Sequence, residues 1–482
     1  NDFASGTSSS STKLIHGGLR YLEHYKFRLV QESLKEREIL LNMAPHIIWP
    51  MRFILPHTKG MRPRWFLRLG LAIYDHLGYR KILPGTSNVN FASQKTDSPL
   101  KDTFKSGFEY SDCWVDDSRL VILNAVDAAS KGASLRNYTK VTNATSSNGL
   151  WTISTKNSLN GKVEIVKAKA FVNASGPWVD EVLKESFKFK DSKNVRLVRG
   201  SHIIVNKLYE GDKSYICQNK DGRIFFIIPY EDNFTLIGTT DIDHGKSADQ
   251  VKISEQEKSY ICESASSYLK QEITTNDIVW SYSGVRPLYD DGASKAQEAT
   301  RDYVVSAKEY DYSLMINIFG GKITTYRRLS ETILEHIENF LGKRGKPWTE
   351  HSRLPGGEIK VATLSEFEAK LKNKYSFFTN KLIRRLARSY GEISFDIFGD
   401  ADSLDVLGEN FGGGLYEAEV QYLINNEWAR SSDDILFRRS KLGLILSETE
   451  IENLNLFLKK YNTKSQSSEN IVPSENKEVL KA

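Results

Sequence analysis

The sequence predicts an α/β protein with an added antiparallel sheet and a separate helical domain at its carboxyl end. Between about 120 and 310, short runs rich in β-branched and aromatic residues alternate with a few long helical stretches, as in α/β folds. From 363 to 460 the sequence is helical nearly throughout, with few β-branched runs and many Lys/Glu pairs. Pro355-Gly356-Gly357 stands between these regions and marks a domain boundary.

The amino-terminal part predicts two helices around a strand. Apolar residues recur at helical spacing from Phe27 to Met43, and Pro45 ends that helix because the residue before a proline is pushed out of the α region. The run from Ile47 to Pro56 is bounded by prolines and predicts a strand. Residues 63–78 predict an apolar, aromatic helix that carries Arg64 and Arg68.

Short strands are predicted through the middle of the chain, followed by one more helix. The runs that predict them begin at Trp151, Val163, Ala170, His202, Ile224 and Phe234. A strand and a double glycine at Ile318–Gly321 then lead into a helix that runs to about Leu341. We therefore expect a body over 1–350 built from interleaved segments, a helical domain over 351–462 and a disordered polar tail over 463–482.

Composition excludes several classes of protein. The 482 residues include 66 Lys+Arg and 61 Asp+Glu, and a net charge of +5, evenly spread, does not indicate a nucleic-acid partner. Cys113, Cys217 and Cys262 are far apart, so neither a disulfide framework nor a zinc site or other metal centre is predicted, and the chain suits a reducing compartment. No apolar run reaches the length of a transmembrane helix.

Glycine and hydroxyl-rich segments offer the first candidate sites. Gly412-Gly413-Gly414 lies in the helical region with no preceding strand, so it is not a dinucleotide fingerprint. The run Ser5–Lys13 joins many hydroxyls and backbone N–H groups to a cation, which suits a phosphate or the edge of a heterocycle, although a solvated loop has the same composition. Asn173–Trp178 follows an apolar strand, where a nucleotide or an ordinary turn is equally compatible.

Cationic loops offer candidate anion sites. In His16–Tyr21 the paired glycines allow close backbone approach and Arg20 can bind an anion, the alternative being a tight turn with a surface arginine. Arg286 stands among small and apolar residues, which favours a fixed anion receptor. Arg301 is a second candidate, or the partner of Asp302. In Ile318–Arg327 the start of a helix follows a double glycine, and its free backbone amides suit an anion.

These motifs, in this order, resemble the FAD-dependent glycerol-3-phosphate dehydrogenases, above all the aerobic respiratory enzymes of bacteria. The strings that carry the resemblance span nearly the whole chain and include Ser11–Tyr25, Met51–His57, Gly107–Asp117, Gly238–Asp241 and Asn426–Arg430. The resemblance implies a Rossmann-like FAD-binding domain interleaved with a mixed or antiparallel substrate domain, plus a carboxyl-terminal all-helical domain. The family opens with a βαβ unit carrying GxGxxG, and this sequence begins after it, so we expect an N-terminally truncated flavoenzyme.

The resemblance also implies a reaction and a set of site residues. The reaction is oxidation of sn-glycerol 3-phosphate to dihydroxyacetone phosphate, with hydride transfer from C2 to N5 of FAD and electrons passed to quinone. The alternatives are an oxidase that uses O₂ and a truncated scaffold without catalysis. The implied substrate-binding residues are Arg20, Tyr21, Arg286, Arg301 and Lys322. The implied FAD-binding residues are Thr7, Ser8, Ser11, Thr12, Lys13, Leu14, His16, Ser175, Gly176, Lys322 and Thr324.

Catalytic roles and a location follow from the same resemblance. The C2 hydroxyl must lose a proton, and His202 is the candidate base because the ordinary pKa of histidine suits that task. Arg286 is the candidate stabiliser of the developing oxyanion. The basic, aromatic helix at 63–78 suits an anionic membrane surface, with a buried helix as the alternative. We thus expect a homodimer, cytoplasmic and held peripherally at the cytoplasmic face of the inner membrane.

Overall fold

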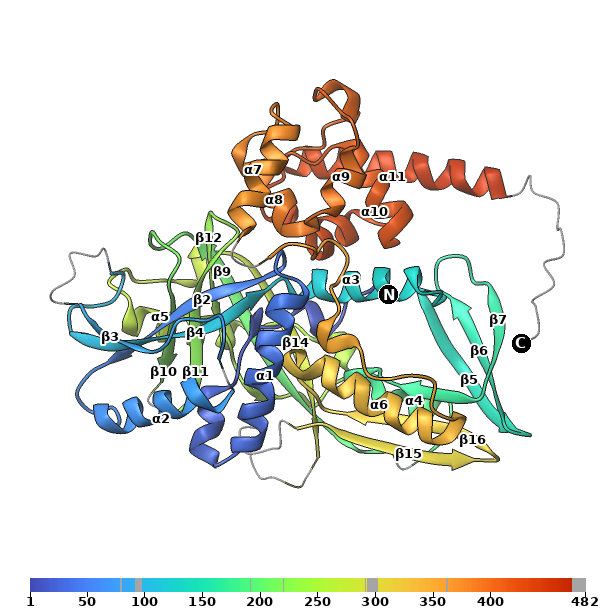
Figure 1. Cartoon of the computed structure of the whole chain (residues 1–482), viewed down its shortest axis with the longest axis horizontal. Coiled ribbons are helices and arrows are strands. Elements are labelled where there is room, and N and C mark those ends of the chain that lie inside the picture. The colour runs from blue at the N-terminus through green and yellow to red at the C-terminus, as the bar shows by residue number, and fades with distance from the viewer. Residues whose placement is uncertain are drawn as a thin grey trace.

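The computed structural model describes every residue except 79, 92–97, 191, 220, 291, 293–301, 361–362 and 470–482. Within these described residues the body contains one ten-stranded sheet, in the order β1-β4-β2-β10-β11-β12-β9-β13, with β14 beside β9 and β3 beside β4 (Figure 1). The strands are β1 (Leu14–Ile15), β2 (Ile48–His57), β3 (Ser87–Asn90), β4 (Ser106–Val115), β9 (Val195–Asn206), β10 (Ser214–Gln218), β11 (Ile224–Tyr230), β12 (Phe234–Gly238), β13 (Ile242–Asp243) and β14 (Ile278–Tyr289). All neighbours are antiparallel except β10 and β2.

Two three-stranded sheets complete the body of the described chain. One has the order β15 (Val304–Tyr310), β16 (Ser313–Phe319), β8 (Ala170–Asn173), and β8 runs parallel to β16. The other is the antiparallel meander of β5 (Thr139–Ser147), β6 (Leu150–Asn157) and β7 (Val163–Ala168). The helices of this region are α3 (Asp117–Ser130), α4 (Val179–Glu185), α5 (Glu255–Tyr268) and α6 (Tyr326–Leu341). The predicted α/β class with a mixed sheet is confirmed.

The predicted amino-terminal elements form where the sequence pattern places them. Helix α1 (Phe27–Met43) buries Val30, Leu34 and Leu40, the apolar positions that recur at helical spacing. Helix α2 (Arg64–Leu77) buries only Leu71 and Tyr74, and it leaves the large apolar side chains of Trp65, Phe66 and Leu69 exposed. An apolar pattern alone does not distinguish a core helix from a surface one, and here the packing decides in favour of the surface.

The carboxyl-terminal domain is helical, as predicted. It contains α7 (Leu364–Lys374), α8 (Asn380–Tyr390), α9 (Ile393–Phe398), α10 (Glu417–Glu427), a π-helical segment (Asp434–Arg439) and α11 (Glu448–Glu469). Helix α11 extends into the segment expected to be a disordered tail, and residues 470–482 lie outside the described chain. The linker packs tightly against α8, since a Cβ on Gly356 would lie 2.0 Å from the carbonyl oxygen of Tyr390.

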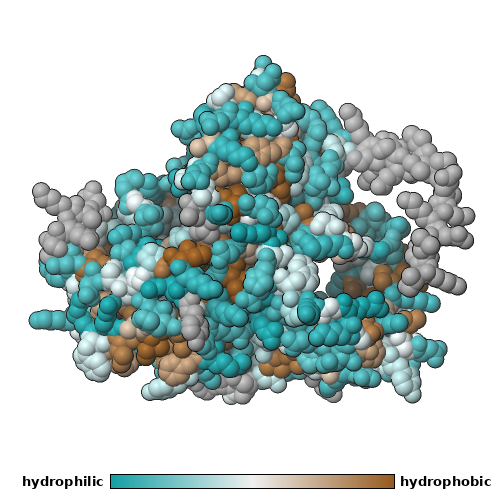
Figure 2. Space-filling view, viewed as in Figure 1, coloured by the Kyte–Doolittle hydropathy of each residue, from teal (hydrophilic) through white to brown (hydrophobic). Residues whose placement is uncertain are grey.

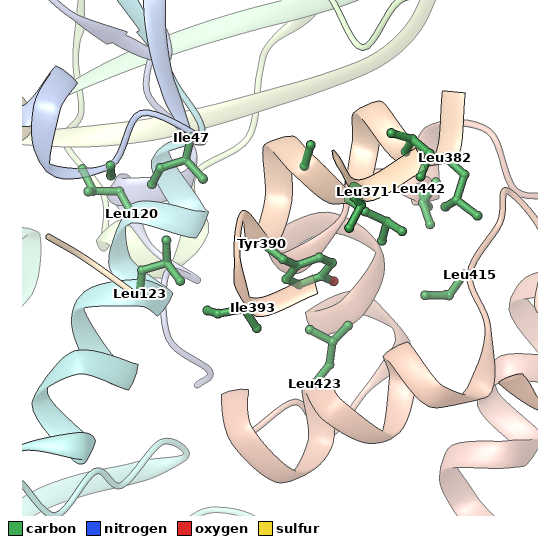
Figure 3. Close-up of a cluster of buried hydrophobic side chains, with 14 of the residues drawn as sticks. Ile47, Leu120, Leu123, Leu371, Leu382, Tyr390, Ile393, Leu415, Leu423 and Leu442 are labelled. Atoms are coloured by element: carbon green, nitrogen blue, oxygen red, sulfur yellow. The ribbon is translucent and has the colours of Figure 1, made fainter. Parts of the chain in front are cut away.

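One continuous hydrophobic cluster joins the helical domain to the body. Ile47, Leu120 and Leu123 of the body belong to the same cluster as Tyr390 and Leu423 of the helical domain (Figure 3). Figure 1 shows the helical domain seated on the body above α3. Because the two parts share buried apolar surface, each depends on the other for part of its stability.

A buried ion pair lies at this junction. Arg119 of α3 and Glu427 at the end of α10 are both fully buried, and the guanidinium donates to the carboxylate over 2.9 Å. Arg119 also donates to the carbonyl oxygen of Ser389 and its guanidinium lies 5.0 Å from the ring centroid of Tyr390. These contacts satisfy the charge from several sides, which a buried ion requires.

Replacing Arg119 by methionine should lower the free energy of unfolding by about 3–5 kcal/mol, because it leaves the carboxylate of Glu427 buried without this partner. Urea denaturation measures the change. The matched control is Lys374→Met, which removes an exposed pair with Asp400 and should cost at most about 1 kcal/mol. Equal losses in the two variants would contradict this account of the junction.

Candidate active site

A cavity of about 1660 Å³ runs between the sheets of the body. Ligand pockets for small molecules measure roughly 300–1,000 Å³, so this one has room for a dinucleotide together with a second ligand. Most of the predicted site residues line it: Thr7, Ser8, Ser11, Thr12, Leu14, His16, Arg20, Tyr21, Ser175, Gly176, Arg286, Lys322 and Thr324. Arg301, also predicted, lies outside the described residues.

The hydroxyl-rich loop before β1 is held from behind by one buried carboxylate. Asp117, the first residue of α3, accepts hydrogen bonds from the backbone N–H of Ser11 at 3.2 Å and from its Oγ at 2.7 Å. It also accepts from the Lys13 ammonium at 2.8 Å, and both side chains of this ion pair are buried. Lys13, predicted to bind FAD, therefore points away from the cavity wall in this structure and fixes the loop.

His202 lies behind the cavity wall. Its Nε2 is 2.9 Å from Oγ1 of Thr12, and Thr12 lines the cavity. The imidazole stacks on Tyr282 with a centroid separation of 4.8 Å, and the Tyr282 hydroxyl donates to the carbonyl oxygen of Ser11. Burial, together with the charges of Arg286 and Lys13, holds the pKa of His202 well below its ordinary value. The ring is thus neutral at pH 7, burial and the two cations oppose its protonation, and its contact with the cavity runs through Thr12.

The loop that carries Arg20 and Tyr21 is positioned by a second buried carboxylate. The backbone N–H of Gly17 donates to the Tyr74 hydroxyl at 2.8 Å, and that hydroxyl donates to Asp112 at 2.8 Å. Gly18 adopts φ +78°, which favours glycine and turns the chain into the 3₁₀ helix Leu19–His24. The guanidinium of Arg37 lies 2.6 Å from the Asp112 carboxylate and balances its charge.

Two segments far apart in the sequence meet at this end of the cavity. The Lys322 ammonium lies 4.1 Å from the centroid of the Tyr21 ring, a cation–π distance. The backbone N–H of His16 donates to Oγ1 of Thr324 at 3.3 Å, which joins the two segments directly. Burial lowers the pKa of His16 although Asp112 acts in the opposite direction. Cations and a neutral imidazole therefore face one part of the cavity.

Arg286 lies on β14 at another part of the wall. Its guanidinium pairs with Asp241 and donates to Oγ1 of Thr239 at 3.0 Å. It lies close to Gly200 of β9, where a Cβ would be 2.5 Å from a guanidinium nitrogen. A larger residue at this position would displace the guanidinium from where it lies.

Sequence reasoning missed the carboxylates that hold these loops, Asp112, Asp117 and Asp241. Each stands in a string that carries the family resemblance, but an aspartate in a strand or at a helix start gives no sign of its partner. Their partners are 75, 104 and 45 positions away in the sequence, at Arg37, Lys13 and Arg286. Only the fold brings these charges together.

Comparison with known proteins identifies the family. The family model described as FAD dependent oxidoreductase matches residues 1–327, and the C-terminal domain of alpha-glycerophosphate oxidase matches residues 347–456. The chain belongs to the FAD-dependent oxidoreductases. Residues 328–346 lie between the two matches.

Similar proteins lie within the same family. D-erythritol 1-phosphate dehydrogenase of Brucella abortus is 48% identical over 450 residues, which cover 93% of this chain and 90% of that protein. Aerobic glycerol-3-phosphate dehydrogenase of Escherichia coli is 45% identical over 461 residues, covering 95% and 91%. The crystal structure of glycerol-3-phosphate dehydrogenase from Bacillus halodurans complexed with FAD matches with a TM-score of 0.71 and 25% identity, covering 96% and 88%.

The residues of the cavity fit the cofactor of this family. The wall offers the hydroxyls and backbone groups of Thr7–Thr12 on one segment and Ser175-Gly176 on another. Gly176 adopts φ +57° with no atom within 4 Å of where its Cβ would be, which leaves open space for a ligand against the backbone. A dinucleotide can therefore lie along this oxidoreductase's cavity in contact with main chain.

Replacing Asp117 by asparagine should lower the free energy of unfolding by about 3 kcal/mol, because the buried Lys13 ammonium loses its counter-charge. The affinity for FAD should fall as well, since the loop Ser11–Lys13 loses its anchor. Denaturation and a flavin-fluorescence titration measure the two effects. Asp127→Asn on the same helix removes an exposed pair with Lys131 and serves as control. Unchanged stability in Asp117→Asn would contradict the anchoring role.

Proposed function

We propose that this chain oxidises sn-glycerol 3-phosphate to dihydroxyacetone phosphate with FAD, and that the electrons pass on to quinone. The observation that carries the proposal is the convergence of Arg20, Tyr21, Lys322 and Arg286 on one cavity that fits a dinucleotide. The names of the similar glycerol-3-phosphate dehydrogenases support it. When bound, FAD supplies the acceptor for the hydride that leaves C2.

Different side chains of the cavity bind the phosphate, stabilise the developing charge and accept the proton. Arg20 and Lys322 bind the substrate phosphate, with Arg301 as a further predicted contact, because phosphate needs cationic donors. Arg286 donates to the C2 oxygen and stabilises the negative charge that develops there. The proton leaves toward Thr12, whose hydroxyl connects the cavity to the neutral imidazole of His202. The apolar wall residues Ile216 and Phe226 exclude water.

FAD is held, in this proposal, by cavity residues from several segments. These are Thr7, Ser8, Ser11, Thr12, Leu14, His16, Ser175, Gly176, Lys322 and Thr324, with Lys13 acting on the loop from behind. The backbone and hydroxyl donors among them suit the polar edge of an isoalloxazine ring and a ribityl chain.

The Brucella abortus relative suggests a second candidate substrate to compare with glycerol 3-phosphate. D-erythritol 1-phosphate, named for that protein, shares with glycerol 3-phosphate a primary phosphate and a secondary alcohol. The same cations can bind the phosphate of either compound. The ratio of the two kcat/KM values decides which polyol phosphate the site prefers.

The variant Arg20→Leu should raise KM for glycerol 3-phosphate by about 10- to 100-fold with a smaller effect on kcat, because it removes a charge-assisted contact to the phosphate. Arg286→Leu should instead lower kcat, since its contact strengthens as charge develops. Steady-state kinetics with FAD and a quinone analogue under anaerobic conditions give both constants. Arg28→Leu, which removes an exposed arginine of α1, is the control and should change neither.

Other outcomes point to the alternatives. Hydrogen peroxide formed in air at the rate of substrate oxidation would favour a glycerol-3-phosphate oxidase. A purified chain that takes up no FAD and oxidises no polyol phosphate would favour a non-catalytic scaffold. Analytical ultracentrifugation tests the expected homodimer.

An exposed aromatic patch supports contact with a membrane surface. On α2, Trp65 is 69% and Leu69 51% exposed, and Tyr25 on the neighbouring loop is 81% exposed. Figure 2 shows brown, hydrophobic surface over α2.

Arg62 and Arg68 flank the patch, and cations beside aromatic side chains suit an anionic interface. No helix of the described residues is both long and apolar enough to span a bilayer. We infer peripheral attachment at the cytoplasmic face of the inner membrane.

Trp65→Glu should weaken binding to anionic lipid vesicles by about tenfold or more, because it replaces an inserted aromatic side chain by a charge. Co-sedimentation with vesicles measures the bound fraction. Val406→Glu, at a residue of the helical domain that is 61% exposed, should bind as the wild type does. If the wild type, Trp65→Glu and Val406→Glu all bind the vesicles equally, α2 is not the surface that contacts the membrane.

A further inference from the structure

The segment Asn1–Ser8 lines the cavity along its whole length, and the helical domain holds it through one carboxylate. The side chain of Asp2 is fully buried, and so is that of Arg439 from the helical domain. Arg439 donates to the Asp2 carboxylate at 3.2 Å, and Arg438 donates to it at 3.1 Å. A buried carboxylate requires such partners, so these two arginines tie the segment to the helical domain.

The two arginines are themselves fixed by acidic and carbonyl groups of the helical domain. Arg439 donates to the carbonyl oxygen of Glu427 at 2.6 Å, and its guanidinium lies 3.8 Å from the carboxylate of the same residue. Arg438 pairs with Asp434, whose carboxylate also accepts from the backbone N–H of Arg430 at 2.7 Å. The guanidinium groups therefore have set positions, to which the Asp2 carboxylate docks.

A ring contact and a bridging amide lie next to this ion pair. Phe3 meets Trp428, the residue after α10, edge to face with the ring centroids 5.5 Å apart. The side-chain amide of Asn137 donates both to Asp2 at 3.0 Å and to the carbonyl oxygen of Trp428 at 2.9 Å. Charged, aromatic and amide contacts thus all join the cavity segment to the helical domain.

The stretch of cavity wall between Asp2 and Thr7 is held at both ends. Oγ1 of Thr7 donates to the carbonyl oxygen of Val285 in the body at 2.7 Å. Between these ends Ala4 adopts φ +57°, a conformation that costs energy for a residue with a Cβ and persists where the surroundings impose it. The body fixes one end of the stretch Phe3–Gly6, and the helical domain fixes the other.

We propose that Arg438, Arg439 and Trp428 are positioning residues for FAD, through which the helical domain holds the cavity wall Phe3–Gly6 in place. This inference rests on the proposed function in taking FAD as the ligand of the cavity. It gives a part in cofactor binding to a domain none of whose described residues lines the cavity. Because coupling between two sites acts in both directions, bound FAD in turn holds the helical domain against the body.

Hydrogen exchange on the full chain, measured with and without FAD, tests the coupling directly. In the wild type, FAD should slow exchange at Phe3–Gly6 and also, by about fivefold or more, across the π-helical segment Asp434–Arg439, which lies outside the cavity wall. In Asp2→Asn the effect on Asp434–Arg439 should be lost. The Kd for FAD, from a flavin-fluorescence titration, should rise about tenfold or more in this variant.

Trp428→Leu is a second test variant, since it removes the ring against Phe3 and leaves every buried charge paired. It should also weaken FAD binding, by about fivefold. Arg385→Met is the matched control, because it breaks a buried pair with Glu419, 2.6 Å long, inside the helical domain. This control should lower the urea midpoint as Asp2→Asn does, yet bind FAD as the wild type does.

Three results would overturn the proposal. One is a wild type in which FAD leaves exchange at Asp434–Arg439 unchanged, a result that needs no variant to fold. Another is wild-type affinity for FAD in folded Asp2→Asn and Trp428→Leu proteins. The third is an equal loss of affinity in Arg385→Met, which would assign the effect to general destabilisation. A wild type that takes up no FAD would instead overturn the proposed function.

Discussion

The first turn of α3 is the constraint on which the other parts of the molecule depend. Asp117 holds the loop Ser11–Lys13 at the cavity wall, and Asp116 caps the helix by accepting from the backbone N–H of Arg119. Arg119 itself is buried against Glu427 of the helical domain. The first turn of this one helix thus connects the cavity loop to the contact with the helical domain, and a shift of either would disturb the other.

A further contact strengthens this junction. Lys441, from the helical domain, lies 3.3 Å from the Asp116 carboxylate. Burial raises the pKa of Asp116, but the charges of Lys441 and Lys13 outweigh it and leave the pKa below its usual value. The carboxylate is therefore ionised at neutral pH, when it can both cap α3 and pair with Lys441 of the helical domain.

Buried carboxylates lie behind three of the segments that line the cavity. Asp117 stands behind the loop before β1, Asp112 behind the loop of Arg20, and Glu257 behind the segment of Asp241. Each accepts several hydrogen bonds, so charge-assisted contacts help to hold these loops in place. Loops built in this way keep polar donors directed at a ligand without needing the ligand to order them.

Most of the secondary structure could be predicted from local pattern, because helix and strand periodicity are properties of neighbouring residues. Helix α1, strand β2 and the helical region after Gly357 all lie where the spacing of apolar residues indicates. The same is true of the motifs, since Arg20, Arg286 and Lys322 stand out locally by their glycine or apolar neighbours. By itself the sequence determined many of the helices and strands, the family, and the candidate residues of the site.

Only the tertiary structure decided which charged side chains form ion pairs and which side chains are buried. The spacing of α2 is as compatible with a core helix as with the exposed one that the fold contains, because burial depends on what packs against it. Likewise, nothing near His202 in the sequence indicates that Thr12 separates its ring from the cavity. Asp241 and Arg286 are 45 positions apart, and their pairing follows from strands β12 and β14 both lying beside β9. A sequence specifies its long-range contacts only through the fold, so the electrostatics of the site emerge when the strands assemble.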